Sequence, residues 1–258
     1  MAKDAIKFVD NDVTVVTPPR KPVLAVGLGR GGGGKSTVLA ELVWRAKAQG
    51  RSVIVADGDA RSKTLSSLFP DAIHPASEEM PDIKAFLADL LNRMVKENKS
   101  AVLDLGGGDR ALLELGRELR LVEFCKRRGI DPLAIYCLGP DEEDLSHIHT
   151  IFKGGYFRPE RMVLFTNEGV IRAGQHVAGA FERTTNDERF KEIMNAGARS
   201  ILLTRLACMP QVKGLPVGLY TAAAGKAGLE PVQEFMVEDW LADIESQRRE
   251  EGVAEWMP

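Results

Sequence analysis

The chain is poor in cysteine, which excludes several classes of protein. It has three cysteines in 258 residues, and no two of them form a CxxC pair. So few and so scattered thiols cannot build a disulfide framework or a thiolate zinc site. We therefore expect Cys125, Cys137 and Cys208 to be reduced and mostly buried.

Long apolar runs are also missing. No uncharged apolar run approaches the ~18 residues that a membrane-spanning helix needs. The first dozen residues carry five charges, so they do not read as a signal peptide. We expect a cytoplasmic protein that is not attached to a membrane.

No strong excess of charge is present either. The formal net charge is −3, which argues against a nucleic-acid binder that uses its whole surface and leaves a local basic patch open. Apolar residues (44%) and charged residues (28%) stand at ordinary globular values. Without repeats or long linkers, we expect one domain over 1–258, with 1–21 as an extension or edge strand and 230–250 as a C-terminal helix packed on the domain.

Apolar strand-like segments alternate with amphipathic helical segments along the chain. The expected strands are 13–16 at an edge, 23–26, 52–56, 101–105, 133–138, 162–166 and 201–206. The expected helices are 36–49, one opened by Pro81, 112–128, 142–152, 187–194 and 232–247. This alternation predicts a three-layer α/β fold, a mostly parallel twisted sheet with helices on both faces. Ligands of such sheets bind beyond the carboxyl ends of the strands.

Two segments carry more detailed expectations. The last helix should bury one apolar set, and the stretch 63–79 is rich in loop-forming residues. The expected buried set of the last helix is Val232, Phe235, Met236, Trp240 and Ile244.

A glycine-rich loop follows the strand at 23–26 and precedes the helix at 36–49. It matches G-x-x-x-x-G-K-[ST] with Gly29, Arg30, Gly31, Gly32, Gly33, Gly34, Lys35 and Ser36. Glycines let backbone N–H groups turn toward phosphates, and the helix N-terminus adds positive charge. Lys35 suits the β- and γ-phosphates, and the Ser36 hydroxyl suits Mg²⁺. A flexible glycine linker is the plain alternative, but the flanking strand and helix argue against it.

Acidic residues end the two neighbouring strands. Asp57 and Asp59 follow the strand 52–56, and Asp104 ends the apolar run 101–103 before three glycines. Carboxylates there can hold a magnesium shell or orient an attacking water. An aspartate at a strand end is often only a turn former, but two such ends beside a phosphate loop favour function.

With these motifs the sequence resembles the ParA/MinD class of deviant-Walker P-loop ATPases. The family loop K-G-G-x-G-K-[ST]-T corresponds to residues 30–37, and its aspartate-x-aspartate corresponds to Asp57-Gly58-Asp59. The resemblance is specific over about residues 22–65 and fair at Asp104. It departs at Arg30, which replaces the signature lysine, and at Ala60-Arg61, which replaces Pro-Gln. Both departures suggest a divergent branch, such as one carried by plasmids.

The resemblance implies roles for individual residues. Lys35 and Ser36 would bind phosphate and magnesium, Thr37 would contact the α-phosphate, and Asp59 would position the hydrolytic water. Asp57 and Asp104 would support the metal. Asn167 would read adenine, and Pro210 would belong to the loop that covers the base. Arg30 would reach the phosphates in cis or across an ATP-bound dimer.

The family also binds DNA or membranes in many cases, so we examined the surface charge. The final helix is acidic and does not read as a membrane anchor. The clearest basic cluster, a candidate for salt-dependent contacts with DNA phosphates, is Arg117, Arg120, Lys126, Arg127 and Arg128. A smaller group is Lys153, Arg158 and Arg161. A solvated charged face is the alternative for both.

The leading hypothesis is therefore an ATP-dependent switch that uses Mg·ATP to close a homodimer and reopens it by slow hydrolysis. It would serve segregation, transfer or positioning of DNA or a protein complex, including plasmid partition, with a protein partner. One alternative is a P-loop kinase or ligase that acts on a small substrate. The other is an adaptor that binds nucleotide without hydrolysing it.

Overall fold

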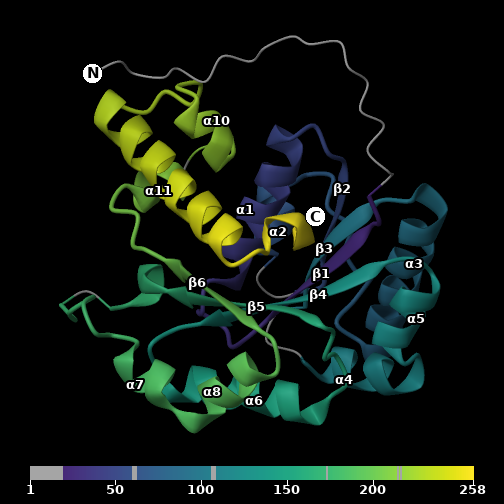
Figure 1. The fold of residues 1–258 in the computed structure, drawn as a ribbon. Coiled ribbons are helices and arrows are strands. Elements are labelled where there is room, and N and C mark those ends of the chain that lie inside the picture. Colours follow the sequence, from purple (N-terminus) through teal and green to yellow (C-terminus); the bar gives the residue numbers. More distant parts are fainter. Residues whose placement is uncertain (1–19, 60–62, 106–108, 173, 214, 216) are drawn as a thin grey trace.

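A computed structural model describes residues 20–59, 63–105, 109–172, 174–213, 215 and 217–258 (Figure 1). The predicted edge strand at 13–16 and the three glycines after Leu105 lie outside the described residues. The described chain folds around one sheet of six strands in the order β2-β3-β1-β4-β5-β6. The strands are β1 Val23–Leu28, β2 Val53–Asp57, β3 Ser100–Asp104, β4 Asp131–Leu138, β5 Arg161–Asn167 and β6 Arg199–Leu203.

Every neighbouring pair of strands in this sheet is parallel, as the alternating pattern predicts. The inner strands are buried on both faces, which explains their continuous apolar sequences. β1 lies between β3 and β4, so the glycine loop leaves the middle of the sheet at its carboxyl edge.

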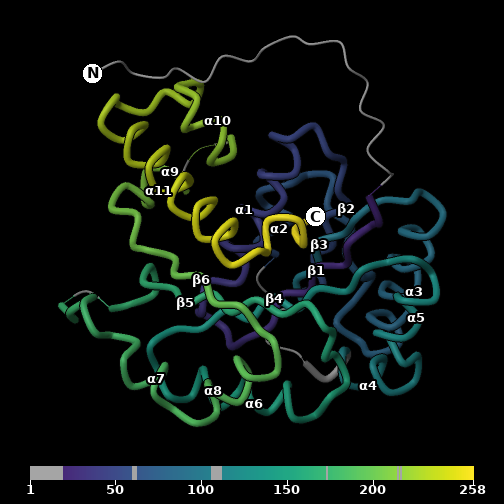
Figure 2. Tube along the Cα trace, viewed as in Figure 1, coloured from purple at the N-terminus to yellow at the C-terminus, as the bar shows by residue number. Residues whose placement is uncertain are grey.

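Helices cover both faces, which gives three layers (Figures 1 and 2). One face carries the helices α3 Met80–Glu97, α4 Asp109–Glu118, α5 Leu121–Arg127, α6 Glu142–Gly154 and α8 Glu188–Asn195. The other face carries α1 Lys35–Ala48, α2 Thr64–Leu68, α9 Met209–Lys213, α10 Leu219–Ala223 and α11 Pro231–Glu250. The short helix α7 Glu182–Asn186 precedes α8, and single 3₁₀ turns follow β5 (η1 Glu168–Val170) and α11 (η2 Ala254–Trp256). The predicted fold class is confirmed.

Two details of the sequence prediction are wrong, and one short helix was missed. The helix expected at 112–128 is two helices, because Arg120 adopts a left-handed conformation (φ 48°) and turns the chain between α4 and α5. The strand expected at 201–206 begins earlier and ends at Leu203. Beyond it Trp240 Nε1 donates to the Thr204 carbonyl at 2.8 Å, in place of a strand partner. The short helix α2 within the loop-rich stretch 63–79 was not predicted, and its Leu65 is fully buried.

The last helix buries Trp240 and Ile244, as expected, but the rest of its buried face differs from the prediction. α11 buries Val237, Trp240, Leu241, Ile244 and Arg248. Val232 and Phe235 are each 66% exposed and Met236 is 39% exposed, so their predicted burial is wrong.

The three cysteines are free and buried, as predicted, and burial raises the pKa of Cys125 and of Cys137 to about 12.

Candidate functional site

The glycine loop connects the end of β1 to the start of α1 in a strained path that only glycine allows. Gly29 has φ 135°, and a Cβ there would lie 2.5 Å from the Cys137 carbonyl oxygen of β4. Gly34 has φ 86°, and a Cβ there would lie 2.0 Å from Asn167 Nδ2 of β5. The loop is therefore pressed against the ends of the adjacent strands, and side chains at these two positions would displace it.

Lys35 is the first residue of α1 and is 6% exposed. Its ammonium donates to the carbonyl oxygens of Gly29 at 2.9 Å and Arg30 at 3.0 Å. The lysine thus folds back across its own loop, which places a buried positive charge at the start of a 14-residue helix whose N-terminus adds to the positive potential. This is an anion-binding arrangement.

Asp104 lies beside the loop and contacts the next helical residue. The parallel register pairs Asp104 with Gly27 of β1 and with Asp57 of β2. Ser36 Oγ donates to Asp104 Oδ2 at 2.8 Å, and Asp104 is 2% exposed. A hydroxyl and a carboxylate therefore converge within one turn of Lys35, which is a donor set that suits Mg²⁺ in the presence of phosphate oxygens.

Asp57 and Asp59 have different surroundings. Asp57 is buried and accepts from the backbone N–H of Ser66 at 2.7 Å and of Asp59 at 3.2 Å, so its carboxylate holds α2 and the turn after β2. Because β3 separates β2 from the loop, Asp57 does not line the main cavity. Asp59 does line it, together with Thr64. Asp59 is thus the carboxylate of the predicted D-x-D pair that faces the cavity.

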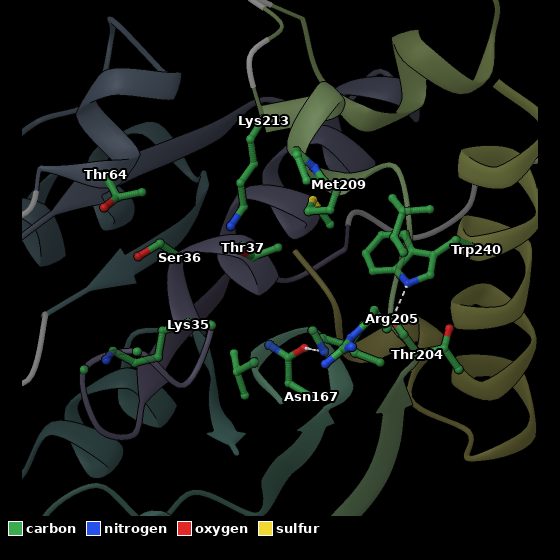
Figure 3. Close-up of a pocket in the computed structure, with 18 of the residues that line it drawn as sticks. Lys35, Ser36, Thr37, Thr64, Asn167, Thr204, Arg205, Met209, Lys213 and Trp240 are labelled. Carbon is green, nitrogen blue, oxygen red and sulfur yellow. Dashed lines mark hydrogen bonds between the residues drawn. The ribbon is translucent and has the colours of Figure 1, made fainter. Parts of the chain in front are cut away.

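A cavity of about 740 Å³ runs from the phosphate loop along the carboxyl edge of the sheet (Figure 3). Most of the predicted site residues line it: Gly31, Gly32, Gly34, Lys35, Ser36, Thr37, Asp59, Asp104, Asn167 and Pro210. A volume of this size is typical of a small-molecule site. The cavity brings together residues from the ends of β1, β3, β5 and β6.

Asn167 ends β5 and braces the loop. Its Nδ2 donates to the Gly33 carbonyl at 3.3 Å, and its Oδ1 accepts from Gly169 N–H at 2.9 Å. The amide therefore fixes the phosphate loop against the turn η1. It also lines the cavity, so its predicted contact with a base stays a prediction.

The far end of the cavity holds residues that sequence reasoning missed. Trp240 of α11 and Arg205, two residues after β6, line it, and Lys213 extends from α9 toward Ser36 and Thr37 (Figure 3). Arg205 donates to the carbonyl oxygens of Glu168, at 3.4 Å, and Ile171. Only the position of Lys213, three residues after Pro210 on one short helix, gave a signal in the sequence.

Arg30 points away from this cavity. Its guanidinium lies 2.7 Å from Glu143 Oε2 and 3.5 Å from Asp144 Oδ1, both on α6, and the side chain is 40% exposed. It lines a smaller cavity of about 300 Å³ with Asp141, Asp144 and Arg172. Burial raises the pKa of the Asp144 carboxyl, and the charge of Arg30 opposes this rise. Arg30 is not among the residues that line the main cavity, and its predicted contact with phosphates stays a prediction.

Three of the five residues of the predicted basic cluster form ion pairs with carboxylates. Glu123 pairs with both Arg120 and Arg127, and Glu160 pairs with Lys126. Arg128 stacks over Phe124 with 5.9 Å between the guanidinium carbon and the ring centroid. The structure thus gathers the cluster around the α4–α5 junction but leaves it a mixed surface of both charges.

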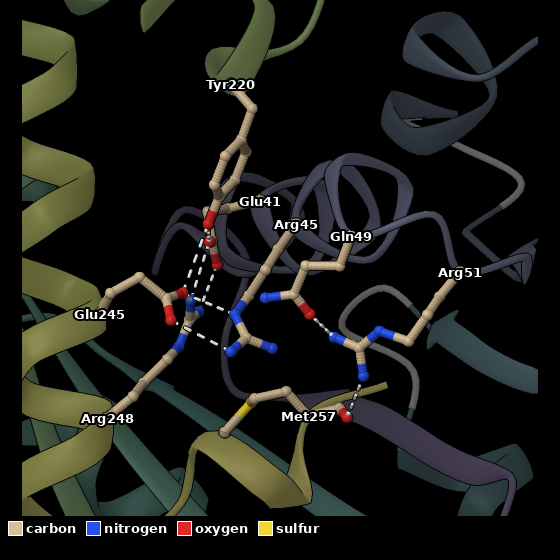
Figure 4. Close-up of polar contacts among 8 residues, drawn as sticks. All are labelled: Glu41, Arg45, Gln49, Arg51, Tyr220, Glu245, Arg248 and Met257. Carbon is tan, nitrogen blue, oxygen red and sulfur yellow. Dashed lines mark hydrogen bonds and ion pairs between the residues drawn. The ribbon is translucent and has the colours of Figure 1, made fainter. Parts of the chain in front are cut away.

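A buried polar network attaches α11 to α1, the helix that follows the phosphate loop (Figure 4). Arg248 donates to Glu41 through both terminal nitrogens, at 2.9 Å for Nη1, and Tyr220 Oη donates to the same Glu41 at 2.9 Å. Arg45 and Arg248 both hold Glu245. Burial alone would raise the pKa of Glu245, but these two guanidinium groups lower it to about 2. α11 is therefore anchored to the helix that positions Lys35 and Ser36.

The comparisons with known proteins concern the fold. No protein-family profile and no curated protein sequence matches the chain. In structure it is similar to the signal recognition particle receptor FtsY from Elizabethkingia anophelis, with a TM-score of 0.50 and 13% identity over 85% of this chain and 65% of that one. It is also similar to chloroplast FtsY from Physcomitrella patens, with a TM-score of 0.45 and 19% identity over 70% and 59% of the two chains.

A third similar structure is a complex of a McdA variant from Cyanothece with ATP. Its TM-score is 0.48, with 14% identity over 88% of this chain and 97% of that one. The chain spans less than two thirds of the FtsY chains. Identities this low show the fold alone, and the FtsY receptor with a TM-score of 0.50 places the chain in the α/β P-loop NTPase fold.

Two further features of the described residues concern membranes and metals. None of their helices combines the length and apolarity that crossing a bilayer requires. No group of three or more histidine, cysteine, aspartate or glutamate side chains that could hold a metal ion occurs among the described residues.

Proposed function

We propose that this protein is an ATP-dependent molecular switch of the ParA/MinD type, which binds Mg·ATP, dimerises while ATP is bound and reopens after slow hydrolysis. One observation carries the proposal. Lys35 and the Ser36–Asp104 pair converge at one end of a cavity long enough for a nucleotide.

The loop fits a triphosphate. A Cβ at Gly31 or Gly32 would meet no atom within 4 Å, so packing does not demand glycine there, although the positive φ of Gly32 (86°) does favour it. Both residues line the cavity, and small residues would let the backbone N–H groups approach phosphate oxygens closely. Lys35 can exchange its two carbonyl partners for β- and γ-phosphate oxygens by a rotation of its side chain.

Ser36 and Asp104 would hold the metal. Bound there, Mg²⁺ would neutralise charge on the β- and γ-phosphates. Ser36 would supply a direct oxygen ligand, and Asp104, 2.8 Å from that hydroxyl, would orient it or a metal-bound water. Asp57 would act more remotely, by fixing the turn that carries Asp59.

Asp59 is the residue that we assign to hydrolysis. It is partly exposed to the cavity beside Thr64, on the side of β2, where a water could approach the terminal phosphate. A carboxylate in this place can orient the water and accept its proton. As the resemblance to the ParA/MinD class implies, we expect slow turnover that a partner accelerates.

Adenine is the base that we propose for the far end of the cavity. Guanine presents an extra N–H₂ donor that a carboxylate would recognise. Among the described residues, the carboxylates that line the cavity are Asp59 and Asp104, and both lie at the phosphate end. Asn167 and the segment around Pro210 are the proposed contacts of the base.

Arg30 is the proposed contact across the dimer. It is half-exposed and 2.7 Å from Glu143, so it would leave α6 to reach the phosphates of a second chain.

As cargo or partner we favour a protein over DNA, because Glu123 and Glu160 neutralise much of the basic cluster. Gel retardation at low salt with Arg127→Glu/Arg128→Glu tests the DNA alternative.

Light scattering with and without Mg·ATP tests the switch. We expect dimers with ATP in the wild type and in Asp59→Ala, and monomers in Arg30→Ala. Monomers of all three proteins in every nucleotide condition would contradict the proposal. Phosphate transfer to a small substrate without release to water would assign the chain to the kinases instead.

A further inference from the structure

The outer face of α11 exposes three apolar side chains in its first two turns. Val232 and Phe235 are each 66% exposed and Met236 is 39% exposed. They lie at positions i, i+3 and i+4 and so form one contiguous stripe, which we call the α11 patch. Packing against the domain uses the opposite stripe of the helix, from Val237 to Arg248. An exposed apolar stripe beside polar residues marks an interaction site.

A groove continues from the α11 patch along the helix. Its volume is about 640 Å³, and its walls are α11 and the segment after β6. It is lined by Thr204, Arg205, Leu206, Ala207, Phe235, Met236, Asp239, Ala242, Asp243 and Ser246, with Trp240 at its base. Phe235 and Met236 of the patch thus line a depression that also has polar and acidic residues in its wall.

The neighbouring sheet edge is closed to an added strand. β6 is the edge strand, but Gln247 of α11 accepts from Leu202 N–H at 2.8 Å and donates to the Leu202 carbonyl at 3.0 Å. This side-chain amide occupies the hydrogen-bonding groups that an extended peptide would need. A partner therefore has to pack by side chains, and an amphipathic helix laid along α11 satisfies that requirement.

The charge around the groove is negative. Glu238, Asp239 and Asp243 are exposed on α11, and none of them makes an ion pair with a residue that the structure describes. Arg205, the cation of the groove, donates to the Glu168 and Ile171 carbonyls on the side of η1. Nucleic acid and anionic lipid are repelled by such a surface, whereas lysine and arginine side chains are attracted to it.

We propose that the α11 patch and its groove bind a basic amphipathic helix of a partner protein. Apolar side chains of that helix cover Val232, Phe235 and Met236, and its lysines or arginines face Glu238, Asp239 and Asp243. Helix-in-groove recognition of this kind uses anchors at i, i+3, i+4 and i+7.

The groove shares part of its wall with the nucleotide cavity. Trp240 and the segment 204–207 line both depressions, and Trp240 Nε1 holds the Thr204 carbonyl at 2.8 Å. A helix that shifts this wall changes the base end of the cavity. This coupling rests on the proposed function, whereas docking of the helix does not.

The test uses a fluorescein-labelled model helix of about 18 residues, with leucine at i, i+3, i+4 and i+7 and lysine elsewhere. Its control has the same pattern with glutamate in place of lysine. Fluorescence anisotropy with the full chain should show binding of the lysine helix about tenfold tighter or more than the glutamate helix. Phe235→Ser/Met236→Ser and Glu238→Lys/Asp239→Lys should each weaken binding by about tenfold or more.

Matched controls lie outside the groove. Val95→Ser changes an apolar residue of similar exposure (42%) on α3, and Glu250→Lys changes an acidic residue at the far end of α11. Both should bind the lysine helix like the wild type. Equal binding of the two helices, or equal weakening by Val95→Ser, would overturn the proposal. So would a dimer in sedimentation that Phe235→Ser/Met236→Ser abolishes, because a second copy would then occupy the patch.

The coupling is measured with a fluorescent ATP analogue and Mg²⁺. A saturating concentration of the lysine helix should change the Kd of the analogue by about fivefold or more, within the usual range of coupling between sites. An unchanged Kd would refute the coupling but would not contradict the proposed docking site. A chain that binds the helix but no nucleotide would refute the proposed function and leave the docking site intact.

Discussion

Arg248 and Glu41 are 207 positions apart in the sequence and form a buried ion pair that joins α11 to α1. Arg248 is fully buried, and a second carboxylate, Glu245, lies 2.7 Å from its Nη1. Burial would lower the pKa of Arg248, but the charge and hydrogen bonds of Glu41 and Glu245 raise it above its usual value. The guanidinium is therefore charged throughout the accessible pH range, and α11 depends on it.

Arg248→Met should destabilise the fold strongly, because it leaves Glu41 buried without its main counter-charge. Breaking a buried pair in this way costs about 3–5 kcal/mol in the free energy of unfolding. Urea denaturation followed by circular dichroism measures the loss. Arg249→Met, which changes the exposed neighbour on the same helix, should stay within about 0.5 kcal/mol. If the two variants unfold alike, the pair does not anchor α11.

Glu245 makes the stability depend on pH in the acid range. Its pKa is lowered from 4.5 to about 2 in the folded chain. The contribution of ionised Glu245 to the free energy of unfolding is therefore complete above pH 4.5 and is lost as the pH falls toward 2. Glu245→Gln should flatten the fall in melting temperature between pH 5 and 3, as thermal melts in that range would show. Glu238→Gln, at an exposed position of α11, is the control, and an identical slope in both variants would refute the assignment.

Asp104→Ala should remove most of the magnesium dependence of nucleotide binding. The ratio of the ATP Kd in EDTA to that in Mg²⁺ should fall by about 10- to 100-fold, as for other residues that orient a metal ligand. Titration calorimetry under both conditions measures this ratio. The account of Ser36 and Asp104 fails if the variant keeps the wild-type ratio.

Asp59→Ala should separate binding from turnover. Because Lys35 and Ser36 carry the proposed phosphate and metal contacts and Asp59 the proposed water, the Kd for Mg·ATP should change little, while phosphate release should slow by about 100-fold or more. A coupled phosphate assay at saturating ATP gives the rate. Wild-type turnover in this variant would transfer the catalytic role to another residue.

Glu143→Gln should make dimerisation easier. The variant removes the partner that holds Arg30 at 2.7 Å, and an exposed ion pair of this kind is worth up to about 1 kcal/mol. The dimer Kd with Mg·ATP should fall by up to about fivefold. Glu142→Gln is the matched control, since Glu142 pairs with Arg189 and Arg183. Weaker dimers in Glu143→Gln would show that this ion pair supports the dimer.

The phosphate end of the site was predictable from sequence, because its residues follow one another from β1 into α1. Asp104 was predictable because parallel strands end at one edge. The base end was predictable only in part, since the resemblance implied Asn167 and Pro210 and both line the cavity. Trp240, Arg205 and Lys213 come from three separate segments that only the packing of α9 and α11 brings together.

Predictions from the spacing of apolar residues also failed at one helix boundary and on one buried helix face. The left-handed turn at Arg120 splits an apolar periodicity that reads as one helix. The stripe through Val232 and Met236 has helical spacing, but Arg248 and Glu41 select another face of α11 for burial. Spacing predicts that a helix is amphipathic, whereas the partner across the core decides which stripe is buried.

The binding of Mg·ATP to wild type and to Lys35→Ala, measured by titration calorimetry, tests the central claim most directly. We predict saturable binding of one nucleotide per chain in the wild type. In Lys35→Ala, checked by its melting curve to be folded, we predict a Kd weaker by about 100-fold or more, which is about 2.7 kcal/mol. Binding of equal strength in both proteins, or no binding of ATP or GTP by the wild type, would contradict the account.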